Sequence, residues 1–475
     1  MILVDRFARA PGGPDPVAPW KGGNLRGILE KLDYLEGLGV SALWLSPVYA
    51  NQRDGYHGYW PVDLFAVDER FGALEDLVAL VRECHRRGLK VLLDMVLNHT
   101  GYDHPMAHDP TKRGWFHHSG AIRWFDQKSL ERGSLHGLPD FAQEKPEVAQ
   151  YLIDMGLWWI DKTGVDGFRL DAVKHVPSSF WRDFSTAMHR RAGPDFLLLG
   201  EVFRGVPSYV ARYQREDGID SVFDVPFADC VRSALTHDSD VRGPGFFRRL
   251  LELRREYKTM LWNEIVRKLT TRRPTDMTHF SELFAAEGAY ARPSLLATVI
   301  DNHDLARFVS EADRPERLEL ALALLLTWRG VPVLTYGTEV GLAGRTSDGS
   351  NRAMMPFGSS PAITRLTKTL IRLRRSSPAL SRGVQIEVFA NRHIYAFLRE
   401  ADGERALVVL NNSREARSRT LILPAWIGWD GEWRDALGGE RLTSSKGRLH
   451  IDVPRRSARI LFAGEAGRRE PSTSP

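Results

Sequence analysis

The sequence predicts an α/β protein, a (β/α)8 TIM barrel with a short irregular excursion after its third strand and a C-terminal antiparallel β-sandwich. Three observations lead to this fold class. Eight short apolar runs alternate with amphipathic helices, as in a parallel sheet buried on both faces. The third unit is interrupted by residues 100–138, which show little periodicity. Beyond residue 382 the pattern changes to six short alternating strands separated by turn residues, HIYAFLRE (393–400), RALVVLN (405–411), RTLILP (419–424), GEWRDAL (431–437), RLHIDV (448–453) and ARILF (458–462).

Each predicted barrel unit pairs an apolar strand with a helix. The eight strands are expected at ILV (2–4), VSALWL (40–45), KVLLDMV (90–96), GFRLD (167–171), FLLLG (196–200), SVFDV (221–225), LLATVI (295–300) and PVLTY (332–336). Helices are expected at NLRGILEKLDYLEGL (24–38), LEDLVALVRECHRRG (74–88) and RLELALALLLTW (317–328), among others. Eight units in about 375 residues fit a closed barrel better than an open doubly wound sheet.

Glycine and proline mark several helix ends. Gly39, Gly88 and Gly164 each follow a predicted helix, where a left-handed C-terminal cap favours glycine. Pro146 stands near the start of PEVAQYLIDMGLWWI (146–160), where its missing amide proton costs nothing. These signals support the predicted order of strands and helices.

We expect four parts along the chain. The barrel comprises residues 1–99 and 139–381, and residues 100–138 form a short inserted domain, which we call the B domain. A segment of that length with weak structure is more often functional than idle. Residues 382–465 form the C-terminal β-sandwich, and residues 466–475 are expected to be a disordered tail.

The composition is that of an ordinary globular protein, with 43% apolar and 26% charged residues and a formal net charge of +5. A local basic run (246–258) lies within a long stretch of unknown purpose (230–292). Its apolar positions have helical spacing, so a solvated helix face is favoured over a nucleic-acid site. Cys84 and Cys230 are too few to form a disulfide framework.

No apolar run reaches the length of a membrane span, and no signal peptide precedes the first predicted strand. We therefore expect a cytoplasmic protein without a membrane partner, or a secreted one if an upstream segment has been trimmed. The sequence leaves open whether the protein is a monomer or a homo-oligomer.

Polar residues gather at the C-terminal ends of the predicted strands, which in a barrel line one cavity. They are Asp94, Asn98 and His99 after the third strand, Arg169 and Asp171 on the fourth, Glu201 after the fifth, and Asp301, His303 and Asp304 after the seventh. A single strand-end aspartate often only caps the next helix. Three carboxylates with an arginine and histidines form a more specific set, because buried like charges repel and survive only with compensating groups or a function.

Two of these carboxylates suggest glycoside cleavage. One would be a nucleophile and the other a general acid, about 5 to 5.5 Å apart in retaining enzymes. Arg169 lies on the same side of its strand as Asp171, and its fixed charge is expected to keep Asp171 ionised, as a nucleophile must be. Apolar neighbours are expected to raise the pKa of Glu201, which would then hold the proton of a general acid.

The same stretches resemble the signature regions of the α-amylase family, glycoside hydrolase family thirteen. The four signature regions are similar, in the right order, to DMVLNHT (94–100), GFRLDAVKH (167–175), LLGEVF (198–203) and VIDNHD (299–304). Two auxiliary regions are similar to GLPDF (137–141) and GVPVLTYGTEVGL (330–342). The resemblance covers nearly the whole chain and these motifs are jointly very specific.

The resemblance implies a role for individual residues. Asp171 would be the nucleophile, Glu201 the acid and base, and Asp304 the third carboxylate, which grips the sugar hydroxyls and distorts the ring. The same sugar would also be bound by Arg169, His99 and His303. DGYHGYWPVD (54–63) resembles the family's substrate-stacking segment, in which Tyr59 would be the ring platform with His57 and Trp60 beside it.

The resemblance also implies the family's calcium site. Asn98 and Asp140 match its side-chain ligands, and His175 matches a ligand that contributes its backbone carbonyl. Oxygen ligands from separate loops suit Ca²⁺. Such a site would tie the excursion 100–138 to the barrel, and the sequence does not identify the remaining ligand.

Within the family, the sequence is similar to the group of α-amylases, cyclodextrin glucanotransferases and maltogenic amylases. The similarity lies in FHHSG (116–120), DAVKHVP (171–177) and NRAMMPF (351–357). Lys174 would contact the sugar beyond the cut, and Trp124 and Phe203 fall where the group keeps two acceptor-side aromatics. His136 replaces the group's central aromatic, and its extra C-terminal domains are not in this sequence. Both differences disfavour the formation of cyclic products and favour hydrolysis or short-chain transfer on soluble oligosaccharides.

We therefore expect a retaining hydrolase of α-1,4 bonds in starch, maltodextrins or malto-oligosaccharides, with an α-glucan as its partner and no nucleic acid. The alternative is a 4-α-glucanotransferase, or an enzyme that forms or hydrolyses cyclodextrins. A non-catalytic barrel used as a scaffold is disfavoured, because all three carboxylates are retained. The sequence does not fix chain length or the choice between α-1,4 and α-1,6 bonds.

Overall fold

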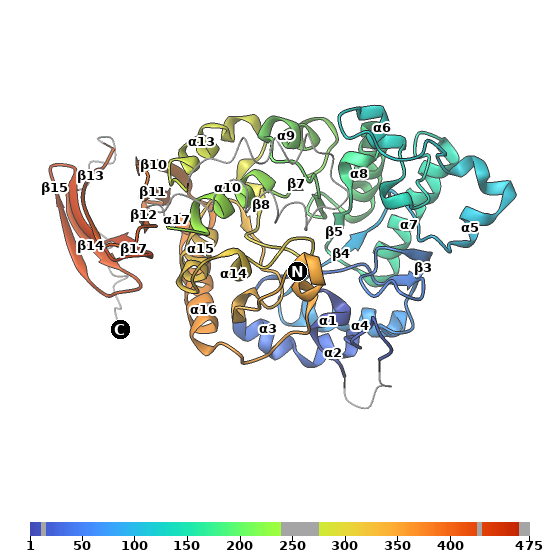
Figure 1. Cartoon of the computed structure of the whole chain (residues 1–475), viewed down its shortest axis with the longest axis horizontal. Helices are drawn as coiled ribbons and strands as arrows, with labels where there is room; N and C mark the ends of the chain where they lie inside the picture. Colours follow the sequence, from blue (N-terminus) through green and yellow to red (C-terminus); the bar gives the residue numbers. More distant parts are fainter. Residues whose placement is uncertain (11–15, 239–274, 425–429, 465–475) are drawn as a thin grey trace, which may run out of the picture.

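The structure is a computed structural model that describes residues 1–10, 16–238, 275–424 and 430–464. Helices surround a barrel of parallel strands, and the C-terminal strands form a separate sheet at one end of the molecule (Figure 1). The basic run 246–258 and the predicted tail 466–475 lie outside the described residues.

The parallel strands occur in the predicted order. They are β1 (Ala42–Leu45), β4 (Lys90–Met95), β5 (Gly167–Leu170), β6 (Leu197–Gly200), β7 (Ser221–Val222), β8 (Ala297–Thr298) and β9 (Val331–Pro332). The first five pair in sequence order in one sheet, and β8 pairs with β9. Their side chains are almost all buried in β4, β5 and β6, which explains the near-continuous apolar runs.

Backbone hydrogen bonds close these strands into a barrel. The amide of Asp224, just after β7, donates to the carbonyl oxygen of Ala297 in β8 at 2.8 Å. The amide of Tyr336 donates to the carbonyl oxygen of Met1 at 2.9 Å, and the amide of Ile2 donates to that of Trp44 at 2.7 Å. The strand predicted at 2–4 is thus reduced to a single bridge at Ile2, because the helix α1 (Val4–Phe7) begins directly after it.

The outer helices are α2 (Leu25–Glu30), α3 (Leu32–Leu38), α4 (Leu74–Arg86), α7 (Pro146–Thr163), α8 (Ser178–Ala192), α9 (Pro207–Glu216), α10 (Val225–Leu235), α13 (His279–Ala285), α14 (Phe308–Glu311), α15 (Glu316–Thr327), α16 (Pro361–Ser376) and α17 (Pro378–Arg382). The helix predicted at 24–38 is in fact two, which meet at Lys31. Gly39 and Gly164 are left-handed caps, as predicted, with φ of 93° and 67°. Within the described residues, no helix is both long and apolar enough to cross a membrane.

The excursion after β4 is more regular than expected. It contains α5 (Pro105–His108), α6 (Gln127–Arg132) and two 3₁₀ turns (Pro110–Trp115 and Leu135–Gly137). The sequence also did not indicate the antiparallel hairpin of β2 (Tyr49–Asn51) and β3 (Pro61–Val67). The turn of this hairpin contains residues 54–60, and the first three residues of β3 complete the segment 54–63. The hairpin thus holds this segment at the mouth of the barrel.

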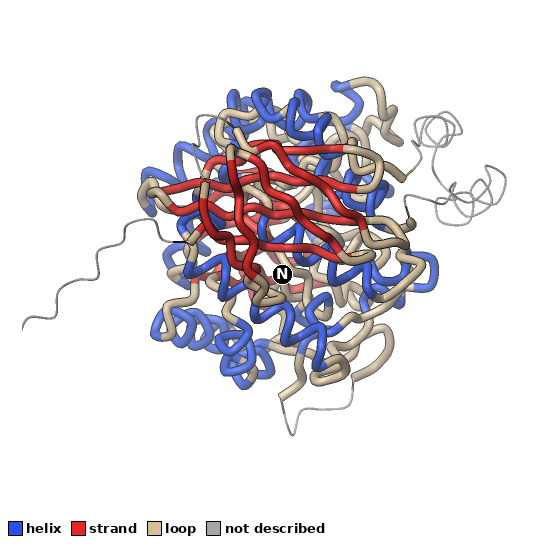
Figure 2. The backbone as a smooth tube through the Cα atoms, turned by 90° about the vertical axis from the view of Figure 1, so that its left-hand side faces the viewer, coloured by secondary structure: helices blue, strands red, loops and turns tan. Residues whose placement is uncertain are grey.

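The C-terminal part is one eight-stranded antiparallel sheet in the order β10-β11-β12-β17-β14-β15-β16-β13 (Figure 2). Its strands are β10 (Val384–Ala390), β11 (Ile394–Ala401), β12 (Glu404–Asn411), β13 (Arg417–Ile422), β14 (Gly431–Asp435), β15 (Arg441–Ser445), β16 (Arg448–Val453) and β17 (Ser457–Ala463). The sequence indicated six of them and missed β10 and β15, which have few fully buried side chains.

Strand β11 joins the sheet to the barrel because both of its faces are buried. Ile394 and Ala396 belong to the core of the C-terminal sheet. Tyr395 and Phe397 point the other way and pack against Trp328 at the end of α15, with ring centroids 6.0 and 5.3 Å away. Because side chains alternate along a strand, β11 contributes to the core of the C-terminal sheet on one face and to the core around Trp328 on the other.

A buried ion cluster lies at the same junction. Asp238 accepts from Arg317 of α15 at 2.6 Å and from Arg456 of the C-terminal sheet at 2.7 Å. Arg317 is fully buried and also bonds Asn412, which follows β12. Asp238 therefore neutralises two arginines from different parts of the chain.

We expect Asp238→Asn to lower the free energy of unfolding by about 3–5 kcal/mol, because it removes the carboxylate that the fully buried Arg317 shares with the mostly buried Arg456. Denaturant titration followed by tryptophan fluorescence measures this change. The matched control is Arg382→Ala, which breaks an ion pair with Asp402 whose two side chains are 68% and 58% exposed. An exposed pair contributes only about 0–1 kcal/mol. Equal losses in the two variants would show that the cluster contributes no more than a surface pair.

Candidate active site

One arginine connects the ends of three neighbouring strands. Arg169 of β5 is fully buried, and its Nη1 lies 2.7 Å from Asp171 Oδ1 and 2.8 Å from Asp94 Oδ1 at the end of β4. Its Nη2 lies 2.7 Å from Oε1 of Glu201, the first residue after β6. The prediction that Arg169 and Asp171 share one side of the strand is confirmed, and the same guanidinium also holds Glu201.

The backbone turns sharply directly after Asp171. Ala172 has a φ of 50°, a left-handed conformation that is unfavourable for a residue with a β-carbon. Its amide nitrogen lies 3.5 Å from Oε2 of Glu201. Asp171 is therefore not the cap of the helix that follows. Asp301 does have such a structural role, because it accepts from the amide of Phe308 at 2.9 Å and from the hydroxyl of Thr338 at 2.8 Å.

Burial raises the pKa of both Asp171 and Glu201 to about 7. Arg169 lowers the pKa of each carboxyl, but burial and the neighbouring carboxylates outweigh it. The prediction of a raised pKa for Glu201 is confirmed. Arg169 favours the ionised form of Asp171, as expected, but it does not keep the pKa of Asp171 low, because burial and Asp94 raise that pKa and the guanidinium is shared by three carboxylates. The two groups thus titrate as a pair that holds one proton near neutral pH.

Asp304 is in a different environment, more open to solvent, with 42% of its side chain exposed. Oδ1 accepts from Nη2 of Arg352 at 2.7 Å, and Oδ2 lies 3.2 Å from Nε2 of His303. Although desolvation opposes it, His303, Arg352 and Arg169 lower the pKa of Asp304 to about 2. This carboxylate therefore stays ionised at every pH at which the pair of Asp171 and Glu201 titrates.

Aromatic rings form one wall of the site. The Tyr59 hydroxyl donates to Asp94 Oδ2 at 2.8 Å, and its ring stacks on His303 with centroids 5.3 Å apart and planes 3° apart. His57 lies between Tyr59 and Trp60, with centroids 5.8 and 4.5 Å away. The predicted association of His57, Tyr59 and Trp60 is thus present in the structure.

The histidines of this wall are neutral. Burial lowers the pKa of His57 and of His303 to about 3, and that of His99 to about 4. His99 directs Nε2 at the backbone carbonyl oxygen of Tyr59, 3.1 Å away, so this nitrogen carries the proton and holds the platform residue. Neutral imidazoles suit hydrogen bonding to uncharged hydroxyl groups.

Three of the predicted acceptor-side residues also come together. The Lys174 Nζ donates to the carbonyl oxygen of Phe203 at 3.0 Å and lies 5.3 Å from the ring centroid of Trp124. The Trp124 ring in turn meets His175 edge-on at 5.8 Å. Phe203 is 42% exposed. The exposed Phe203, the Lys174 ammonium and the Trp124 ring therefore form one group that starts two residues after Glu201 in the chain.

The predicted metal ligands lie where the excursion returns to the barrel. Asn98 and Asp140 are fully buried on adjacent antiparallel segments, where the amide of Phe141 donates to the carbonyl oxygen of Asn98 at 2.9 Å. His175 directs Nδ1 at the carbonyl oxygen of Leu130, 3.0 Å away. Among the described residues, no group of three or more His, Cys, Asp and Glu side chains could hold a metal ion, so a cation here would also need amide and carbonyl oxygens.

Burial raises the pKa of Asp140 to about 6, although the contact with His117 lowers it. His117 was not identified from the sequence as a site residue, although it lies in the quoted motif FHHSG. Arg352 was missed in the same way, within NRAMMPF. The two motifs indicate the family by resemblance only. Nothing in the local pattern around His117 or Arg352 indicates that the side chain binds a carboxylate far away in the sequence.

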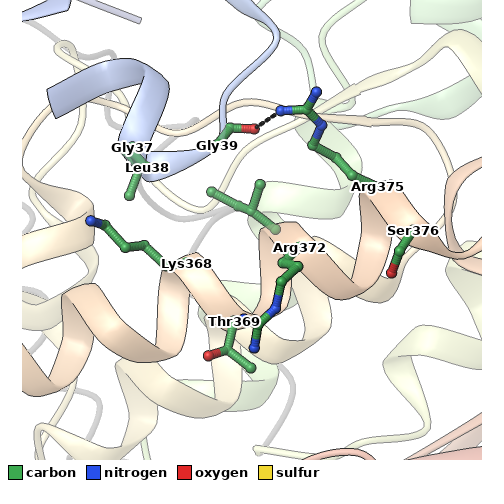
Figure 3. Close-up of a pocket in the computed structure, with 9 residues that line it drawn as sticks. Gly37, Leu38, Gly39, Lys368, Thr369, Arg372, Arg375 and Ser376 are labelled. Atoms are coloured by element: carbon green, nitrogen blue, oxygen red, sulfur yellow. Dashed lines mark hydrogen bonds between the residues drawn. The ribbon is translucent and has the colours of Figure 1, made fainter. Parts of the chain in front are cut away.

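A second depression, between α3 and α16, has different chemistry (Figure 3). Its cavity of about 530 Å³ is lined by Lys368, Arg372 and Arg375 of α16, and its lining contains no carboxylate. Arg375 donates to the carbonyl oxygen of Gly39 at 3.0 Å and so satisfies the C-terminal end of α3. Because cleavage of a glycoside needs acids, we place the active site at the strand ends instead.

The barrel brings two paired carboxyl groups and a further carboxylate together at its strand ends. This arrangement is typical of the active site of a glycoside hydrolase. Known families give the same result: the family described as "Alpha amylase, catalytic domain" matches residues 1–382, and "Maltogenic Amylase, C-terminal domain" matches residues 388–460.

The chain is 31% identical to a beta/alpha-amylase of Paenibacillus polymyxa over 97% of its own length, although it spans only 36% of that relative. It is 29% identical to a cyclomaltodextrinase of Thermoanaerobacter pseudethanolicus, with 87% of this chain and 69% of that one covered. A crystal structure of an α-amylase from Geobacillus thermoleovorans complexed with acarbose matches with a TM-score of 0.86 and 35% identity over 98% of both chains. The chain therefore belongs to the α-amylase family of glycoside hydrolases.

We expect Asp94→Asn to move the acidic limb of the kcat/KM profile for a malto-oligosaccharide to lower pH. The negative charge of Asp94 raises the pKa of Asp171, and without it Arg169 acts more strongly on the remaining carboxyl groups. Tyr59→Phe is the control, because it removes a hydrogen bond to Asp94 but leaves the charge. An acidic limb that stays in place or moves to higher pH in Asp94→Asn would contradict this account of the pair.

Proposed function

We propose that this protein is a retaining hydrolase of α-1,4-glucosidic bonds in starch, maltodextrins or related malto-oligosaccharides. The observation that carries the proposal is the pair of 2.7 Å contacts from one guanidinium, Arg169, to Asp171 and Glu201. A single guanidinium spans only a short distance, which fits carboxyl groups about 5 to 5.5 Å apart in retaining enzymes better than the wider spacing of inverting ones. Membership of the α-amylase family supports the same reaction.

In this mechanism Asp171 attacks the anomeric carbon while Glu201 protonates the departing glycosidic oxygen. The shared proton is assigned to Glu201, because LLGEVF (198–203) resembles the family's signature region that carries the acid and base, and Asp171 is then the ionised nucleophile. Water then attacks the glycosyl-enzyme, Glu201 takes up its proton, and the carboxylate of Asp171 is released. The pair thus ends the cycle with the single proton it began with.

The remaining site residues would bind the sugar whose bond is cut. Asp304 is ionised and accepts hydrogen bonds from sugar hydroxyls, which helps to distort the ring toward the transition state. Tyr59 provides the stacking face, with His57 and Trp60 behind it. Further contacts to the same sugar come from Arg169, His99 and His303, while Lys174 contacts the sugar beyond the cut.

We expect Asp171→Asn and Glu201→Gln each to lower kcat for maltoheptaose by at least about 10³-fold, because each removes a group that forms or breaks bonds in the reaction. Circular dichroism and the melting temperature report whether the fold is intact. Asp161→Asn is the matched control, an aspartate of α7 that pairs with Arg191 on the outer surface. Near wild-type activity in either site variant would show that the roles are wrongly assigned.

A second candidate function is 4-α-glucanotransfer, or the formation or hydrolysis of cyclodextrins. The observation that favours it is the acceptor-side group of Lys174, Trp124 and the exposed Phe203, which could bind a sugar in place of water. The product profile from maltoheptaose separates the two. Products no longer than the substrate indicate hydrolysis, whereas longer or cyclic products would replace the hydrolase proposal with the transferase.

We also propose a calcium site at Asn98 and Asp140, with the backbone carbonyl of His175 as a further ligand. The residues fit a hard cation: Oδ1 of Asn98 and Oδ1 of Asp140 are buried and have no hydrogen-bond partner among the described residues. Bound calcium would neutralise the carboxylate and connect the excursion 100–138 to the barrel.

We expect a chelator to lower the melting temperature of the protein and added calcium to restore it. A ligand that binds only the folded state stabilises it by about 2.7 kcal/mol when present at a hundred times its Kd. Differential scanning calorimetry with and without calcium measures the change. The Asn98→Ala variant serves as control, since it should no longer respond to calcium. A melting temperature that is the same in chelator and in calcium would exclude the site.

A further inference from the structure

His117 contacts Asp140 through both its backbone and its side chain. Its amide donates to the carbonyl oxygen of Asp140 at 2.8 Å, and its Nδ1 lies 2.7 Å from Asp140 Oδ2. The other ring nitrogen, Nε2, lies 3.0 Å from each carboxylate oxygen of Glu144. The side chain of His117 is only 8% exposed. The imidazole is therefore fixed at both nitrogens.

Aromatic packing fixes the backbone that carries His117 and Asp140. Phe116 and Phe141 pair across the two antiparallel segments, and their rings stack with centroids 5.0 Å apart and planes 20° apart. Both are buried. Because His117 and Asp140 are the sequence neighbours of these phenylalanines, their relative position is set by the core rather than by flexible surface side chains.

The two oxygens of the Asp140 carboxylate consequently differ. Oδ2 is occupied by His117, whereas Oδ1 is buried without a hydrogen-bond partner among the described residues, as is Oδ1 of Asn98. A carboxylate held at one oxygen cannot rotate freely, so the other oxygen keeps a fixed direction. Partners of this kind orient the ligands of metal sites, and their loss typically costs 10–100-fold in metal affinity.

We propose that His117 is a positioning residue of the cation site: it holds Oδ2 of Asp140 so that Oδ1 stays available, together with Oδ1 of Asn98, to a divalent cation. Glu144 fixes the imidazole in turn and, because it stands just before α7, connects the site to the start of that helix. The inference rests on the calcium site proposed above and assigns it two residues that do not touch the metal.

Two substitutions at one position test the inference. The amide nitrogen of asparagine occupies roughly the place of Nδ1, so His117→Asn keeps the donor to Asp140 and loses the contact with Glu144. The amide nitrogen of glutamine reaches roughly the place of Nε2, so His117→Gln keeps Glu144 and loses Asp140. We expect the Kd for calcium, measured by competition with a fluorescent chelator, to rise about 10–100-fold in His117→Gln and to change little in His117→Asn.

His118→Gln is the matched control, because His118 is the exposed neighbour that contacts only the carbonyl oxygen of Arg113, at 3.1 Å. The melting temperature in chelator separates general destabilisation, which is independent of calcium, from the increment that calcium adds. If His117→Gln binds calcium as tightly as the wild type, or if His117→Asn loses as much affinity as His117→Gln, the positioning role is wrong. If the wild type binds no calcium at all, the calcium site and this inference fail together.

Discussion

The active site depends on the ion cluster around Arg169. Burying one guanidinium with three carboxylates costs much free energy, because all four charged groups lose their contacts with water. The arrangement is stable only if each carboxylate contacts the guanidinium closely and the excess negative charge is neutralised. Adjacent parallel strands supply the match, because the cross-strand register sets Asp94 of β4 directly opposite Arg169 of β5. One positive charge does not balance three negative ones. The excess is relieved by a proton, and a proton on a buried carboxyl group is what acid catalysis requires.

The two sides of the site therefore differ in proton affinity for a physical reason. Asp171 and Glu201 lie deep in the barrel and share Arg169 with Asp94, and they bind a proton near neutral pH. Asp304 stands nearer to solvent with its own arginine, Arg352, and remains ionised. Carboxyl groups thus provide both a proton carrier and a permanent anion, depending on how many of them share one arginine.

The sequence predicted the barrel, the order of its strands and the gathering of Asp171, Glu201 and Asp304 at the strand ends, because apolar runs and strand ends are local patterns. It did not predict that Arg169 also holds Glu201, since that contact depends on the register of two strands. Arg352 and His117 were missed for a related reason: their partners, Asp304 and Asp140, lie 48 and 23 residues away. The strand β15 was missed because RLTSS contains a single apolar residue, whereas β10, VQIEVFA, does alternate between apolar and polar residues and could have been predicted.

The closing contact of the barrel has a consequence for the order of folding. The carbonyl of Met1 meets the amide of Tyr336, and Ile2 pairs with the strand β1. During synthesis at about 5–20 residues per second, the first residues emerge on the order of tens of seconds before their last partner exists. In that interval the edge of the growing sheet at Met1 and Ile2, beside β1, has no partner strand, and edges of this kind favour association with other chains. The barrel is therefore most vulnerable to aggregation while it is being made, before a complete substrate site has formed.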